Sequence, residues 1–182
     1  MIIMKAINIF ILLMFLVGFC CCDDEENIHV EEEGPRRDYD INSTDPVKKI
    51  VSEFFFNTGK EFIVDPDSSD YLYNFAEKNG VKMYPVSDAN RDYLLSTVQL
   101  IKSGFLDCYT TEFVKENFPY SVIIADTIYD TGTYLTPKIV DNIARINYYG
   151  VNVAGKANLD LAEQKAFLAL VHYDFFNTYL SV

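Results

Sequence analysis

The longest apolar pattern in the chain lies near its C-terminus, between Leu159 and Leu180. Apolar residues recur there at spacings of three and four, which predicts one face of an α-helix; they are Phe167, Leu170, Val171, Phe175 and Tyr179. Leu168 and Phe176 widen this face until the later turns are apolar nearly all round, as in buried helices. We therefore predict a long C-terminal helix, with Asn158 as its N-cap, in the middle of the domain.

Further helices are predicted upstream from their start and stop signals. Asp45 is a good N-cap before a proline at the first helical position, and Gly59 is a suitable stop. A second helix is predicted to open at Ser87 or Asp88. A short third helix covers Thr111–Asn117, because Pro119 disfavours helical backbone in the residue before it.

Extended segments are predicted where β-branched and aromatic residues cluster. They cover Glu61–Asp65, Val81–Val86, Tyr120–Ala125 and one or two strands within Ile143–Val153, whereas Ile128–Pro137 is turn-rich. Helices and strands in this order predict an α+β fold: a small mixed or antiparallel sheet packed on helices, with the C-terminal helix central.

The N-terminus carries the pattern of a signal peptide. Lys5 precedes an apolar run that ends at Phe19, and cysteines follow at positions 20, 21 and 22. Lipoprotein processing requires a small residue before the modified cysteine, which disfavours Cys20 after Phe19. We predict lipidation at Cys22, with Cys21 as second choice, and cleavage that removes residues 1–21. An ordinary secretory signal with surplus cysteines is the alternative.

The rest of the chain divides into a tether and one domain. Residues 22–38 are rich in acidic residues and poor in apolar ones, which predicts a disordered tether. Residues 39–182 are long enough for a single α+β domain. The formal net charge of −12 gives no electrostatic footprint for nucleic acid. Cys108 has no partner for an internal disulfide in this domain, and we predict a buried structural thiol.

Polar residues interrupt the apolar C-terminal helix at His172, Tyr173, Asp174 and Asn177. Their segment, VHYDFFNTYL, resembles the His-Glu-x-x-His helix of zinc-binding metallopeptidase lipoproteins associated with substrate import, in which the motif commonly reads His-His-Glu-Phe-x-His. The resemblance implies that Tyr173 and Asn177 stand at the two zinc-ligand positions, and Asp174 at that of the catalytic glutamate. His172 matches the extra histidine before the motif.

These replacements predict a degenerate metal site. Zinc prefers imidazole, thiolate or carboxylate ligands, whereas Asn177 offers an amide oxygen and Tyr173 a phenol with a pKa near 10. The family's third ligand lies downstream of the motif, beyond Val182. We therefore expect no catalytic residues and no cofactor, with His172 as a possible remnant ligand. Without the resemblance, His172 and Asp174 are interpreted as hydrogen-bonded core groups.

The resemblance and the predicted lipid anchor lead to three functional hypotheses. The favoured one is a non-catalytic binding or accessory protein on the outer-membrane surface, whose partner is a nutrient importer, a peptide or a glycan. Acidic residues directly after a lipidated cysteine resemble the surface-export signals of such lipoproteins. The alternatives are an active zinc-dependent hydrolase with a rebuilt site around His172 and Asp174, and a truncated, inactive remnant.

Overall fold

The computed structural model of the protein describes residues 36–72, 80–86, 91–132 and 136–180. The predicted signal peptide, both candidate lipidation cysteines, nearly all of the tether and the predicted helix start at Ser87 or Asp88 lie outside these residues. The folded unit comprises residues 38–182. Among the described residues, no helix has the length and apolar character needed to cross a bilayer.

The N-terminal half of this unit is mostly helical. Its elements are α2 (Pro46–Thr58), β1 (Glu61–Ile63), α3 (Ser68–Tyr71), β2 (Val81–Tyr84), α4 (Arg91–Gly104), the 3-10 turn η2 (Leu106–Cys108) and α5 (Thr111–Asn117). Strands dominate the next part: β3 (Ser121–Ala125), β4 (Thr127–Asp130), β5 (Lys138–Ile139), β6 (Asn142–Ala144) and β7 (Tyr148–Asn152). The 3-10 turn η3 (Lys156–Asn158), α6 (Leu161–Phe175) and the π-helical segment η4 (Phe176–Leu180) complete the unit.

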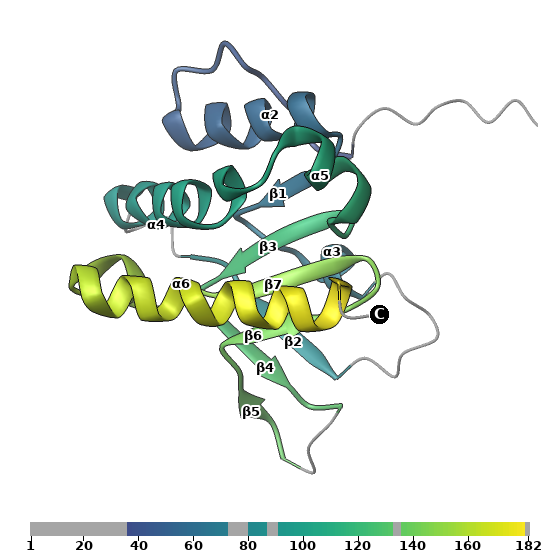
Figure 1. The fold of residues 1–182 in the computed structure, drawn as a ribbon, viewed down its shortest axis with the longest axis vertical. Helices are drawn as coiled ribbons and strands as arrows, with labels where there is room; N and C mark the ends of the chain where they lie inside the picture. Colours follow the sequence, from purple (N-terminus) through teal and green to yellow (C-terminus); the bar gives the residue numbers. More distant parts are fainter. Residues whose placement is uncertain (1–35, 73–79, 87–90, 133–135, 181–182) are drawn as a thin grey trace, which may run out of the picture. The chain divides into compact units, whose positions relative to one another are not determined.

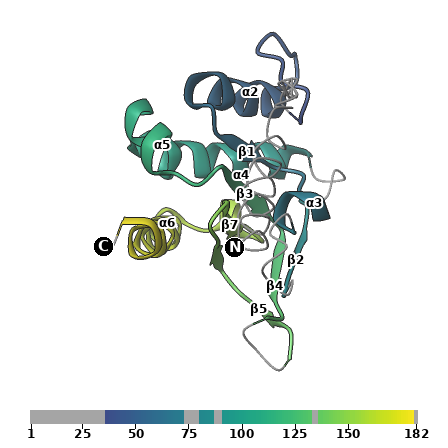
Figure 2. The ribbon, with the colours of Figure 1, turned by 90° about the vertical axis from the view of Figure 1, so that its right-hand side faces the viewer.

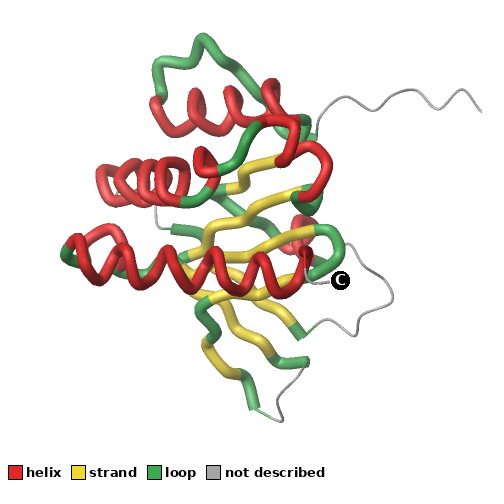
Figure 3. Tube along the Cα trace, in the orientation of Figure 1, coloured by secondary structure: helices red, strands yellow, loops and turns green. Residues whose placement is uncertain are grey.

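The strands form two sheets. The first has the order β1-β3-β7-β6, in which β1, β3 and β7 run parallel and β6 runs antiparallel to β7. The second is antiparallel, with the order β2-β4-β5. In Figure 3 the strands lie next to one another from β1 down to β5, and α6 crosses in front of them. The predicted α+β class, with small mixed and antiparallel sheets on helices, is therefore confirmed.

The four-stranded sheet separates two hydrophobic cores, because successive side chains of a strand point to opposite faces. Val122 and Ile124 of β3 belong to the core under the helices. Ile123 and Ala125 of the same strand belong to the core shared with β2 and β4. Figure 2 shows this layering, with α5 and α6 on one side of β3 and β7, and β2 and β4 on the other. All five residues of β3 are buried, as expected of a strand covered on both faces.

Local capping explains the helices that the sequence predicted correctly. The carboxylate of Asp45 accepts a hydrogen bond from the amide of Val47 at the start of α2, and Gly59 ends this helix in the left-handed region at φ 70°. The hydroxyl of Thr110 accepts from the amide of Phe113 and so caps α5. Both helices have their predicted bounds.

The C-terminal helix differs from its prediction in two ways. Asp160, not Asn158, is the N-cap, because Asp160 and Glu163 form a reciprocal capping box while Asn158 belongs to η3. The helix is also not central: in Figure 1 it crosses in front of the strands, and in Figure 2 it lies to one side of them. Its buried residues are Phe167, Val171 and Phe175 on one side only, so α6 covers the sheet from outside.

Two further expectations are wrong. The segment expected to be turn-rich contains β4, whose alternating burial comes from pairing with β2 and β5 rather than from a local apolar run. Cys108 is exposed rather than buried. Its segment η2 turns away from the core after Leu106, which is 2% exposed.

Candidate functional site

His172 is held by hydrogen bonds at both ring nitrogens. Its Nε2 lies 2.9 Å from the carbonyl oxygen of Gly104 at the end of α4. Its Nδ1 lies 2.7 Å from the hydroxyl of Tyr109. A carbonyl can only accept, so Nε2 donates to Gly104; with the proton on Nε2 alone, Nδ1 accepts from the Tyr109 hydroxyl. Both nitrogens through which a histidine could bind a metal ion are therefore in use.

The hydroxyl of Tyr109 keeps the proton that it donates to Nδ1 of His172. Burial raises the pKa of Tyr109 to about 12, with a smaller contribution from Cys108, so the phenol stays protonated near neutral pH. The rings of Tyr109 and Phe105 pack around the imidazole, with centroid distances of 5.6 Å and 5.2 Å. This arrangement makes His172 a hydrogen-bonded core group at the junction of α4, η2 and α6.

Asp174 lies on the opposite flank of α6. Its Oδ2 accepts a hydrogen bond of 2.9 Å from the side-chain amide of Asn142 on β6. The Oδ1 of Asn142 is buried and has no hydrogen-bond partner in the described structure. Residues two apart on a helix do not face each other, which explains why His172 meets α4 while Asp174 meets the sheet.

Tyr173 and Asn177 stand between these flanks on the outer side of the helix. Tyr173 is 64% exposed, and Asn177 is exposed as well. The two ligand positions of the motif thus share one exposed side of the helix, while His172 and Asp174 lie on its two flanks. Within the described part of the chain, no group of three or more His, Cys, Asp or Glu residues could hold a metal ion. A phenol and an amide at the ligand positions do not fit the zinc site of the His-Glu-x-x-His motif.

The sequence did not identify the partners of the motif residues. These partners come from segments far from α6 in the chain: Gly104, Tyr109 and Asn142. Nothing in the sequence around them indicates that they bond to the motif residues. A hydroxyl or carbonyl partner for a buried histidine was expected in general terms, but its position required the fold.

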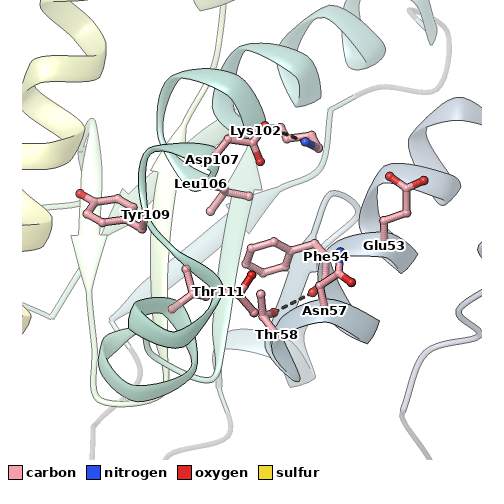
Figure 4. A pocket seen from close by; sticks show the side chains of 10 residues that line it. Glu53, Phe54, Asn57, Thr58, Lys102, Leu106, Asp107, Tyr109 and Thr111 are labelled. Carbon is pink, nitrogen blue, oxygen red and sulfur yellow. Dashed lines mark hydrogen bonds and ion pairs between the residues drawn. The ribbon is translucent and has the colours of Figure 1, made fainter.

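A pocket lies on the other side of Tyr109, between α2 and the segment from α4 to α5 (Figure 4). Its lining includes Glu53, Asn57 and Thr111, together with the ion pair of Lys102 and Asp107 at 2.6 Å. The volume is about 120 Å³, well below the roughly 300–1,000 Å³ typical of small-molecule sites. The Tyr109 hydroxyl points away from the other lining residues, toward α6 (Figure 4), so its ring separates the pocket from His172.

No protein-family model, curated protein or solved structure was found to match this chain. The resemblance to metallopeptidase lipoproteins therefore stays a prediction from the motif.

Proposed function

We propose that this protein is a non-catalytic binding or accessory protein, related to zinc metallopeptidase lipoproteins and anchored in the outer membrane through Cys22. Its partner in this proposal is a component of a nutrient-import system, a peptide or a glycan. The predicted signal peptide, the acidic tether and the motif in α6 together support a surface-exposed lipoprotein of this kind.

The hydrogen bonding of His172 carries the non-catalytic part of the proposal. Hydrolysis by this motif requires two ligands on one helix face and a carboxylate directed at the bound water. In this chain His172 bonds to Gly104 and Tyr109, Asp174 bonds to Asn142, and Tyr173 faces outward. Each side chain therefore serves packing or lies on the surface rather than assembling a zinc site.

The pocket beside Tyr109, at about 120 Å³, is smaller than the roughly 300–1,000 Å³ of small-molecule sites. A peptide, glycan or importer component would instead contact the outer surface of the folded unit. The alternative of a rebuilt zinc-dependent hydrolase would need His172 to give up at least one of its two hydrogen bonds, for example the bond from Nδ1 to Tyr109.

The zinc content of the chain, purified without a metal-binding tag, tests this proposal. We expect less than about a tenth of an equivalent of zinc after incubation with the metal and gel filtration, since structural and catalytic zinc sites need three or four protein ligands. We also expect no zinc-dependent hydrolysis of peptides. The matched control is His172→Ala, which should retain the same trace of zinc as the unmodified chain.

One equivalent of zinc that is lost in His172→Ala or Asp174→Ala would contradict the proposal. In that case an unconventional zinc hydrolase would replace the binding protein as the leading hypothesis. Saturable binding of a peptide, a glycan or an importer component without turnover would identify the partner.

A further inference from the structure

The outer side of α6, together with the first residue of η4, carries a continuous uncharged strip. Its members are exposed and recur at spacings of four, three, four and three: Ala162, Ala166, Ala169, Tyr173 and Phe176. We call these residues the α6 strip. On a helical wheel the strip lies directly opposite Phe167 and Val171, which face the sheet. In Figure 2, where α6 is seen end-on, no other labelled element lies outside it.

The spacing of the α6 strip is that of a helix-pairing seam. Alternating steps of three and four residues keep a set of side chains on one line along a helix, as at the a and d positions of a coiled coil. Solvent-facing positions of a surface helix are usually polar or charged. This strip instead contains Tyr173, which is 64% exposed, and Phe176, which is 46% exposed.

The side chains of the strip are graded in size. Alanines occupy its N-terminal half and aromatic residues its C-terminal end. If a second α6 lies antiparallel with its two-fold axis at Ala169, Ala162 of each copy meets Phe176 of the other. In the same register Ala166 meets Tyr173. Large side chains then face small ones on both sides of the axis, where Ala169 meets Ala169, and the surface is complementary to itself, as an isologous contact requires.

We propose that the α6 strip is a homodimer interface, formed by antiparallel pairing of α6 with the same helix of a second copy. The alanines allow the two helix axes to approach closely, within the range of roughly 8–10 Å seen for packed helices. Antiparallel pairing also places the N-terminus of each helix, with its partial positive charge, beside the C-terminus of the other.

The charges and the area of this surface favour a second copy as the occupant. The chain carries a net charge of −12, yet the strip contains no charged residue, so the pairing brings no like charges together across it. Leu170 flanks the strip and is 55% exposed. With aromatic side chains of about 200 Å², the strip and Leu170 offer roughly 500 Å² per copy. Two copies would bury roughly 1,000 Å², the lower limit of a specific interface.

Sedimentation equilibrium of the full chain, in density-matched detergent under reducing conditions, tests the proposal. We expect a concentration-dependent dimer for the unmodified chain. Ala169→Glu and Ala169→Lys each place two like charges at the two-fold axis, and should raise the dissociation constant at least about a hundredfold. Both residues are good helix formers at an exposed position, so the fold should be retained, which circular dichroism checks.

An equimolar mixture of the Ala169→Glu and Ala169→Lys chains gives the sharpest test. Position 169 meets itself only in the register centred there, so the mixture should form a dimer that neither chain forms alone. Ile146→Glu is the matched control. Ile146 is 78% exposed on the turn between β6 and β7, and this variant should dimerise like the unmodified chain.

Two outcomes would overturn the proposal. If the unmodified chain is monomeric at about 100 µM, a concentration at which even weak specific dimers form, the strip would belong to the lipid surface or to the chain's own N-terminal apolar segment. If Ala169→Glu remains dimeric, the two copies pair through another surface.

Discussion

His172 acts as a structural crosslink between α6 and the end of α4. Its imidazole satisfies the Gly104 carbonyl and the Tyr109 hydroxyl at the same time, within packing distance of Phe105. A partly buried polar group that loses its partner costs more than the original bond contributed, because its desolvation is no longer compensated. The residue that resembles a remnant metal ligand is thus explained by its contribution to stability.

His172→Phe should destabilise the protein. The substitution keeps a ring of similar size beside Phe105 but removes the partner of both Gly104 and Tyr109. We expect the free energy of unfolding in urea to fall by about 1–3 kcal/mol. Combined with Tyr109→Phe, it should cost less than the sum of the two single changes, since both remove the same hydrogen bond.

Lys165→Ala provides the control for this experiment. Lys165 is an exposed residue of the same helix, and its replacement should change the free energy of unfolding by no more than about 0.5 kcal/mol. If His172→Phe is as mild as Lys165→Ala, the two hydrogen bonds of His172 do not contribute to stability as inferred.

The approach of α4 to α6 depends on a glycine. A Cβ atom added to Gly104 would lie only 2.9 Å from Cδ2 of Leu168, and closer still to its Cδ1. Gly104 also presents the carbonyl that bonds to His172. The absence of a side chain at this position therefore lets the two elements come close enough for that hydrogen bond.

Gly104→Ala should separate α4 from α6. Overpacking of this kind costs about 1–3 kcal/mol, and a double-mutant cycle with Leu168→Ala measures how much of that cost comes from the clash. In the Leu168→Ala background, Gly104→Ala should cost less than half as much as in the unmodified chain. Equal costs in both backgrounds would show that Leu168 does not set the distance between the helices.

The folded unit as a whole depends on strands that face two cores. β3 supplies one core with Val122 and Ile124, and the other with Ile123 and Ala125. Because β3 belongs to both cores, neither core can be lost without disturbing the other. A polypeptide organised in this way is expected to unfold as one cooperative unit. A cooperative thermal transition of the purified protein would argue against the hypothesis of a truncated, inactive remnant.

Alkaline pH should unfold the protein cooperatively. Burial raises the pKa of Tyr109 to about 12, and it also raises the pKa values of Tyr149 and Tyr179 above their ordinary value. The folded state then keeps protons that the unfolded chain releases above about pH 10. Stability should therefore be constant below about pH 10 and fall as the pH rises further.

Urea midpoints between about pH 8 and pH 12, recorded together with the phenolate absorbance, measure this effect. Tyr149→Phe should make the alkaline loss of stability less steep. The control is Tyr120→Phe, which changes an exposed tyrosine and should leave the slope unaltered. Phenolate formation by all of the tyrosines near pH 10, without any cooperative loss of structure, would contradict the role of the buried tyrosines.

The elements that could be predicted from the sequence are those whose signals are local. The Asp45 cap, the proline after it and Gly59 lie within the ends of α2, so its bounds required no knowledge of the rest of the fold. The same holds for α5, and for β3, whose apolar run suits burial on both faces. β4 was missed because its register is set by β2 and β5 rather than by its own residues.

The sequence by itself determined the α+β class, most helices and strands, and the apolar character of the C-terminal helix. The spacing of Phe167, Val171 and Phe175 also predicted the buried side of that helix. Only the tertiary structure decided that the other side is uncovered and that Leu170 is exposed, because an almost uniformly apolar helix does not show how much of its surface is covered. It also decided the partners of His172 and Asp174, since hydrogen bonds between distant segments depend on how the chain brings α4, η2 and β6 to α6.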